Sequence, residues 1–173
     1  LNRALSDFNK YFDNLASIKI NAAEIHTEKP FSFNIGADKM TGRMDLIAIE
    51  SDGKIQLFDF KSGVKNYRLL DKENEMQLRL YRMAIETCNE FNELLINKSG
   101  FSLKYVFLGD EKKQEYELPP DFYDYETFNE KLKKLLSNIK EENFKPLAAG
   151  SYACRNCRLR ILCSNYDFTV FVH

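Results

Sequence analysis

The sequence predicts a mixed α/β fold, in which helices flank a central β-sheet. Three apolar strand segments follow one another between residues 28 and 63, and a long segment with one apolar helical face comes directly after them. A fourth strand segment and a final amphipathic helix complete the order helix, three strands, helix, strand, helix. The 173 residues suit one domain with its own core, so we expect a single domain over residues 1–173.

Strands are predicted where apolar residues rich in β-formers alternate or run together. Phe31, Phe33 and Ile35 alternate in the first strand, and the stretch SDGK (residues 51–54) marks a hairpin turn between the second and the third. The predicted strands span residues 28–36, 40–50, 54–63 and 101–109, with residues 113–118 as a candidate fifth.

Helices are predicted where mainly apolar residues recur at helical spacing. Residues 2–14 are expected to be the end of one helix, a long helix runs from about residue 71 to residue 97, and a last helix ends at about residue 142. The residues on one face are Leu5, Phe8 and Phe12 in the first helix, Gln77, Tyr81, Ala84, Cys88, Phe91 and Leu95 in the second, and Phe128, Leu132, Leu135, Leu136 and Ile139 in the third.

The net charge of −1 argues against a protein that merely coats nucleic acid, since phosphate contacts need many basic side chains. It is compatible with an enzyme that contacts a few phosphates and holds a metal ion with carboxylates. The chain has no apolar run long enough to span a bilayer and no secretory signal, so we expect a cytoplasmic protein with no membrane partner. It begins with Leu1 instead of Met, so we expect it to be a piece of a longer protein.

The stretch LFDFKSG places an acid and an amine on one face of an apolar strand, because Asp59 and Lys61 are two residues apart. Asp45 lies on the preceding strand. A two-residue hairpin loop would place Asp45 opposite Phe60, whereas a three-residue loop over residues 51–53 places it opposite Asp59. Gly53 suits the left-handed position that ends a three-residue loop, so we predict that loop or an equivalent bulge.

Two facing carboxylates repel each other unless a positive charge lies between them. A divalent cation, Mg²⁺ or Mn²⁺, would satisfy Asp45 and Asp59 with hard oxygen ligands. Lys61 would then orient or help to deprotonate a metal-bound water, or stabilise charge on a phosphate. A surface hairpin with solvated charges is the alternative, and it fits poorly with the apolar neighbours Leu46, Ile47, Leu57, Phe58 and Phe60.

Three of the four cysteines form a C-x2-C-x5-C segment within residues 152–163. Without a secretory context, Cys154, Cys157 and Cys163 indicate ligands of a metal or a cluster instead of disulfides. Cys88 stands apart on an apolar helix face, where we expect a small buried side chain.

The stretches EKPFSF, TGRMDLI, LFDFKSG and QLRLY occur in this order before the cysteine segment. From about Glu28 to Cys163 the chain thereby resembles the RecB-like PD-(D/E)XK nuclease domains, and most of all the iron–sulfur nuclease domain of AddB-type helicase–nucleases. Nucleases of CRISPR adaptation with a similar cysteine tail are related. The resemblance implies a restriction-endonuclease-like core and a metal-dependent DNA nuclease. It also implies single-stranded DNA ends as substrate, a helicase domain or partner subunit, and a role in recombinational repair.

The resemblance also implies roles for individual residues. Asp45 and Asp59 match the two metal-binding acids, the backbone carbonyl of Phe60 completes the metal ligands, and Lys61 matches the catalytic lysine. Further matches are Gln77 and Tyr81, which form the Q-x3-Y motif near the site and DNA, and Glu28, an acid that precedes the PF pattern. A core aromatic remains the alternative for Tyr81, as does an exposed strand-end charge for Glu28.

Two features of the resembled family are missing from the chain. Its upstream metal-site histidine has no counterpart, because His26 is too close to Glu28, and its fourth cysteine has none either. A 4Fe–4S cluster needs four thiolates, so we expect it to be absent or unstable in this chain and complete in the intact parent protein. A zinc ion, as in an interaction module of the zinc-ribbon kind, would also need a fourth ligand. A non-catalytic DNA-binding or assembly module of a helicase complex is the other rival hypothesis.

Overall fold

The computed structural model describes residues 20–62, 75–109, 115–119 and 123–143, together with Asp13, Ala16, Ile18 and Cys157. The contacts divide the chain into two units, residues 1–132 and residues 133–173. The elements are β1 (Glu24–Ile35), β2 (Asp38–Ile49), β3 (Lys54–Lys61), α2 (Glu75–Thr87), the 3-10 helix η1 (Asn89–Phe91), α3 (Asn92–Leu95), β4 (Gly100–Phe107), β5 (Glu115–Glu117) and α4 (Tyr125–Lys140).

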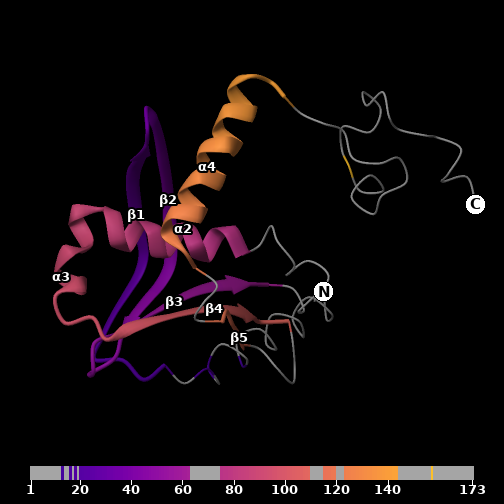
Figure 1. The fold of residues 1–173 in the computed structure, drawn as a ribbon. Helices are drawn as coiled ribbons and strands as arrows, with labels where there is room; N and C mark the ends of the chain where they lie inside the picture. The colour runs from indigo at the N-terminus through magenta and orange to yellow at the C-terminus, as the bar shows by residue number, and fades with distance from the viewer. Residues whose placement is uncertain are drawn as a thin grey trace, which may run out of the picture. The chain divides into compact units, whose positions relative to one another are not determined.

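The five strands form one mixed sheet in the order β1-β2-β3-β4-β5 (Figure 1). The β3–β4 pair is parallel, and each other neighbouring pair is antiparallel. The connection between the two parallel strands contains α2, which contacts β1, β3 and β4. This arrangement confirms the mixed α/β fold, and it is consistent with the restriction-endonuclease-like core. The predicted helix over residues 2–14 lies outside the described residues except for Asp13, which is helical.

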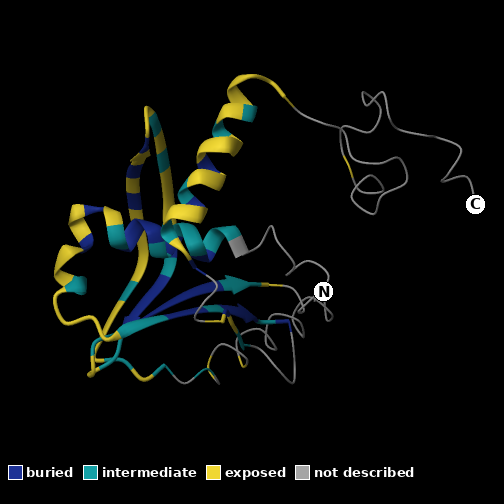
Figure 2. Ribbon diagram, in the orientation of Figure 1, coloured by how far each residue is buried: buried dark blue, intermediate teal, exposed yellow. Residues whose placement is uncertain are grey.

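The central strands are buried on both faces. Figure 2 shows that buried residues gather in β3 and β4, where the exposed fraction of Leu57 is 0% and that of Phe58 is 1%. One face of the sheet carries the apolar cluster Leu46, Ala48, Phe58 and Val106, and the other carries Leu57 with α2. A strand in such a position reads as a nearly continuous apolar run, which is the pattern of LFDF.

The hairpin between β2 and β3 has the predicted three-residue loop. Ile49 pairs with Ile55, and the backbone N–H of Glu50 donates to the carbonyl of Lys54 at 2.9 Å. Gly53 adopts a φ of +85°, the left-handed conformation that glycine adopts without a steric penalty. The ladder ends at Leu46↔Phe58, and the same register continued by one residue places Asp45 opposite Asp59.

Glu28 inverts the side-chain alternation of β1. It has a φ of +52° and falls between the pairs Thr27↔Leu46 and Lys29↔Met44, opposite Asp45. His26 and Lys29 line one cavity although their odd spacing places them on opposite faces of a regular strand. Beyond Glu28, the strand therefore turns its buried side chains, Phe31, Phe33 and Ile35, toward α2.

Gly42 has a packing role opposite this inverted segment. It pairs with Phe31, whose ring occupies the space where a Cβ at residue 42 would lie. A side chain here would displace the ring that packs against Tyr81, with 6.0 Å between the ring centroids.

The prediction of one continuous helix over residues 71–97 is wrong. Residues 71–74 lie outside the described part, and α2 ends at Thr87 because Cys88 is extended, with φ −86° and ψ 126°. The thiol of Cys88 is buried and lies 3.4 Å from the carbonyl of Ser32 as a hydrogen-bond donor, which fixes this residue against β1. The chain then continues through η1 and α3, and Phe91 stays in the predicted buried stripe. Among the described residues, no helix is long and apolar enough to cross a membrane.

Substituting Gly53 should test the hairpin. Gly53→Ala should lower the free energy of unfolding by about 2 kcal/mol or more, because a side chain is strained at positive φ and its Cβ would overlap the carbonyl oxygen of Asn97. Gly36→Ala shares the positive φ, 62°, but has open space, so it should cost only about 1 kcal/mol. Urea unfolding measures both, and equal losses would show that the overlap with Asn97 has no effect.

Candidate active site

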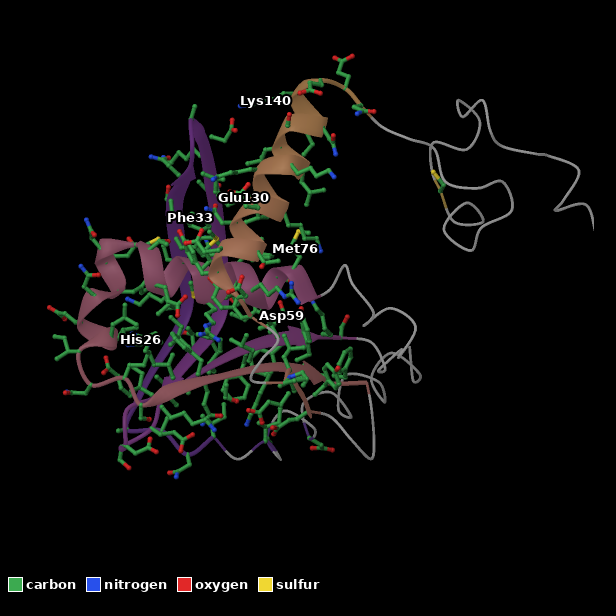
Figure 3. All side chains as sticks on the ribbon, viewed as in Figure 1. His26, Phe33, Asp59, Met76, Glu130 and Lys140 are labelled. Carbon is green, nitrogen blue, oxygen red and sulfur yellow. The ribbon has the colours of Figure 1, made fainter. Side chains whose placement is uncertain are left out.

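Asp59 is a buried carboxylate near the end of β3. Its exposed fraction is 1%, and it lies in the layer between β3 and α2 (Figure 3). Burial raises the pKa of Asp59 above its ordinary value of 3.8, while the close contact and the charge of Lys61 oppose that rise and the nearby charge of Asp45 adds to it. The Nζ atom of Lys61 is 2.7 Å from Oδ2 of Asp59. This ammonium group compensates a charge that burial would otherwise make costly.

Three hydrogen bonds, closed into a ring by the ion pair of Lys61 with Asp59, join these two residues to α2. Nζ of Lys61 donates to Oε1 of Gln77 at 2.9 Å, Nε2 of Gln77 donates to the hydroxyl of Tyr81 at 2.9 Å, and that hydroxyl donates to Oδ1 of Asp59 at 3.4 Å. Gln77 and Tyr81 are four residues apart, so both side chains leave the same face of the helix. The structure thereby brings together four of the residues that the sequence nominated.

Asp45 takes the place of a backbone acceptor where the β2–β3 ladder ends. The backbone pairs of this ladder end at Leu46↔Phe58, and just beyond them Oδ2 of Asp45 accepts the backbone N–H of Phe60 at 2.9 Å. This bond holds the Asp45 carboxylate toward β3 and so beside the strand that carries Asp59. This bond could not be predicted from the sequence, because it depends on where the two strands separate.

Tyr81 belongs both to the core and to the ring of hydrogen bonds. Its exposed fraction is 2%, and its aromatic ring packs edge-on against Phe31. Burial, more than any other cause, raises the pKa of Tyr81, so the hydroxyl stays neutral and can donate to Asp59. A core position and a site position are therefore not exclusive for this residue.

Two predicted site features are not joined to this ring in the described part of the structure. The side chain of Glu28 is 65% exposed and pairs with Arg43 at 3.5 Å. Cys157 is exposed and is not in a disulfide, while Cys154 and Cys163 lie outside the described residues.

Tyr105 is a residue near the site that the sequence did not nominate. It is fully buried on β4, pairs in register with Asp59, and its ring centroid is 5.6 Å from Nζ of Lys61. The alternation of Leu103, Tyr105 and Phe107 could have shown which side of β4 faces the site, but only once the β3–β4 register is known.

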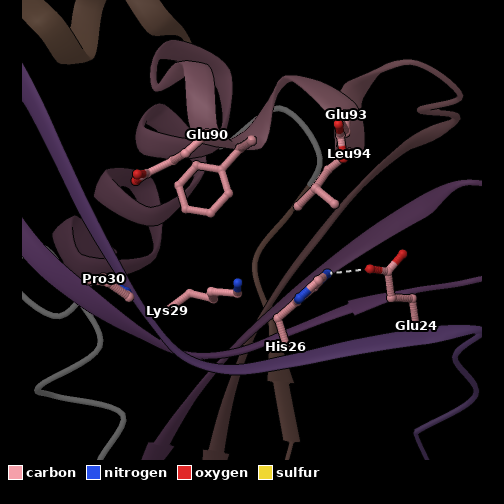
Figure 4. A pocket seen from close by; sticks show the side chains of 8 residues that line it. Glu24, His26, Lys29, Pro30, Glu90, Glu93 and Leu94 are labelled. Atoms are coloured by element: carbon pink, nitrogen blue, oxygen red, sulfur yellow. Dashed lines mark ion pairs between the residues drawn. The ribbon is translucent and has the colours of Figure 1, made fainter.

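A cavity of about 280 Å³ lies apart from the two acids, between β1 and the η1–α3 segment (Figure 4). Its polar wall includes His26, whose Nε2 is 2.8 Å from Oε1 of Glu24. None of the nominated site residues lines it. The lining residues are Glu24, His26, Lys29, Pro30, Glu90, Phe91, Glu93 and Leu94.

The donor set around Asp59 fits a divalent cation held by two carboxylates. Oδ2 of Asp59 is buried and has no well-formed hydrogen bond, only the ion pair with Lys61, and Asp45 is opposite it in the hairpin register. Within the described ranges, no three residues of the types His, Cys, Asp and Glu gather closely enough to hold a metal ion. A cation here would therefore need ligands besides side chains, as Mg²⁺ commonly has in proteins.

The fold and the site define an α/β protein with two facing carboxylates and a lysine on a mixed sheet. The sequence model of the PD-(D/E)XK nuclease superfamily matches residues 2–164, nearly the whole chain. The chain belongs to the PD-(D/E)XK nuclease superfamily, whose members are typically nucleases and generally use divalent metal ions.

Solved structures support the fold independently. Seventeen solved chains match, and the crystal structure of SSO0001 is one of them. The match has a TM-score of 0.54 at 19% sequence identity, and it covers 94% of this chain and 70% of that chain. At this identity the likeness concerns the fold alone. A search among curated proteins gave no match.

The raised pKa of Asp59 predicts a pH dependence of stability. The folded state binds the Asp59 proton more tightly than the unfolded state does. Protonation of Asp59 therefore stabilises the fold fully below pH 3.8, and this stabilisation is lost as the pH rises through the pKa of Asp59 in the folded state. Asp59→Asn removes this titration. The free energy of unfolding of the natural chain should therefore fall relative to that of the variant from about pH 4 upward, measured in metal-free buffer. If the difference in the free energy of unfolding between the natural chain and Asp59→Asn stays constant from about pH 4 upward, the raised pKa of Asp59 is contradicted.

Proposed function

We propose that this chain is a metal-dependent deoxyribonuclease domain that hydrolyses phosphodiester bonds. The observation that carries the proposal is that the Asp45 carboxylate is held toward β3 by the N–H of Phe60, next to Asp59, which is in contact with Lys61. Membership of the nuclease superfamily supports the same conclusion.

Asp45, Asp59 and the backbone carbonyl of Phe60 would hold the cation, Mg²⁺ or Mn²⁺. The N–H of Phe60 points to Asp45, and the N–H and C=O of one strand residue point to the same neighbouring strand, so we expect its carbonyl on that side as well. When bound, the cation supplies Lewis-acid polarisation of the scissile phosphate and a lower pKa for a coordinated water.

The chain's own residues would position and stabilise charge. The side chain of Lys61 is 32% exposed, so its ammonium group can reach an incoming phosphate and stabilise charge at the attacking or leaving oxygen. Gln77 holds that ammonium by its carbonyl oxygen, and Tyr81 holds Gln77 and Asp59 together. A side chain restrained in this way loses less freedom when it acts, which is the advantage of preorganisation.

We further propose the substrate, the partner and the cluster that the resemblance implies. The domain would act on single-stranded DNA ends delivered by a helicase domain or partner subunit, in recombinational repair, as the AddB-type iron–sulfur nuclease domains do. Cys154, Cys157 and Cys163 would supply three thiolates to a 4Fe–4S cluster, with the fourth from outside this set. Cys88 is unsuited to that role, because it is buried and bonded to Ser32.

A non-catalytic DNA-binding or assembly module is the second candidate. It is favoured by the ion pair of Lys61, which already compensates the Asp59 charge within the protein itself. Calorimetric titration with Mn²⁺ separates the two, because a site that has lost its chemistry should bind no Mn²⁺.

Asp59→Ala should abolish Mg²⁺-dependent cleavage of single-stranded DNA, because it removes one of the two facing carboxylates. Asp52→Ala is the matched control, since Asp52 lies in the same hairpin but is exposed and accepts the N–H of Lys54 within its own turn. The assay follows a labelled single strand, and circular dichroism checks that both variants fold. Normal cutting by the Asp59 variant would refute the nuclease site.

Anaerobic reconstitution with iron and sulfide tests the cysteine proposal separately. A visible absorbance band should appear only when a fourth thiolate is supplied, and it should be lost in Cys157→Ala. A band that persists in this variant would show that Cys157 does not bind the cluster.

A further inference from the structure

We propose that Lys61 is an internal counterion that a divalent cation displaces from Asp59, and that this displacement frees the ammonium group for phosphate. The inference rests on the proposed function of the site. It concerns what Lys61 does toward the cation, namely compete with it for one carboxylate oxygen.

The first step is the compensation of a buried charge. Asp59 is 1% exposed, and a carboxylate in such a position needs a partner or must take up a proton. Its Oδ2 has no well-formed hydrogen bond in the described part of the structure and is 2.7 Å from Nζ of Lys61. The oxygen that this amine compensates is therefore one that a cation would also need.

The second step is exclusion. An ammonium group and a divalent cation repel each other, and the repulsion is large at a buried site because little water screens it. The two therefore bind Asp59 in competition. Asp45 does not share in this competition, because its Oδ2 accepts the backbone N–H of Phe60.

The third step is the set of other partners that the Lys61 ammonium already has where it lies beside Asp59. Nζ also donates to Oε1 of Gln77 at 2.9 Å and lies 5.6 Å from the centroid of the Tyr105 ring, which suits a cation–π contact. The side chain is 32% exposed and so has a path toward solvent. Gln77 can therefore keep the released ammonium beside the site. A phosphate would then meet a free lysine only after the cation is in place.

Calorimetric titration of the whole chain with Mn²⁺ tests the competition. Lys61→Met keeps the length of the side chain and removes its charge, so Mn²⁺ should bind this variant about tenfold more tightly than the natural chain, toward the lower end of typical coupling free energies. Lys104→Met is the matched control: it removes another strand lysine in an ion pair, with Glu115 at 3.3 Å, and should leave Mn²⁺ affinity unchanged. Equal or weaker binding by Lys61→Met would overturn the proposal.

A second measurement uses the natural chain and does not depend on the variant folding. Acylation of lysines, read by mass spectrometry, should modify Lys61 several-fold faster at saturating Mn²⁺, with Lys104 as internal reference. An unchanged or slower rate while Mn²⁺ binds would overturn the displacement and leave the proposed nuclease intact. If the natural chain binds no Mn²⁺ at all, the proposed function and this inference both fail.

Discussion

The burial of the Asp59 carboxylate is the constraint on which the arrangement around the site depends. An ionised side chain at 1% exposure is stable only where the fold supplies positive charge and hydrogen bonds. Lys61 supplies the positive charge from the same strand, and Tyr81 on α2 supplies a hydrogen bond from its hydroxyl. The parallel β3–β4 pair makes this possible, because its crossover connection contains α2 and packs it over the sheet face that Asp59 occupies.

The register of one hairpin then decides whether the buried acid has a partner carboxylate. A shift by one residue would turn every side chain of a strand to the other face, so the left-handed Gly53 has an effect far beyond its loop. The ladder from that loop ends at Leu46↔Phe58, where Asp45 replaces a backbone acceptor by bonding the N–H of Phe60. Turn chemistry and ladder length together place two acids side by side.

The sequence predicted those parts of the fold that follow from local rules. Strand alternation showed that Asp59 and Lys61 share a face, and the preference of glycine for positive φ selected the loop. It missed the extended Cys88, whose thiol contacts Ser32 across 56 residues of chain. It also missed the inversion at Glu28. Both depend on contacts between distant segments, which a hydrophobic period averaged over neighbouring residues cannot contain.

The inversion at Glu28 affects the site through the packing of Phe31 against Tyr81. Because β1 changes its alternation opposite Asp45, Phe31 turns toward α2 and packs against the ring of Tyr81, while the Tyr81 hydroxyl bonds Asp59. One aromatic side chain thus joins the outer strand pair to the buried carboxylate. Backbone strain is often retained at functional sites when the surrounding structure compensates it, and the packing of Phe31 on Tyr81 is such compensation. The positive φ of Glu28 is thereby explained by the position of Tyr81, and it requires no direct role of the exposed Glu28 carboxylate in the chemistry.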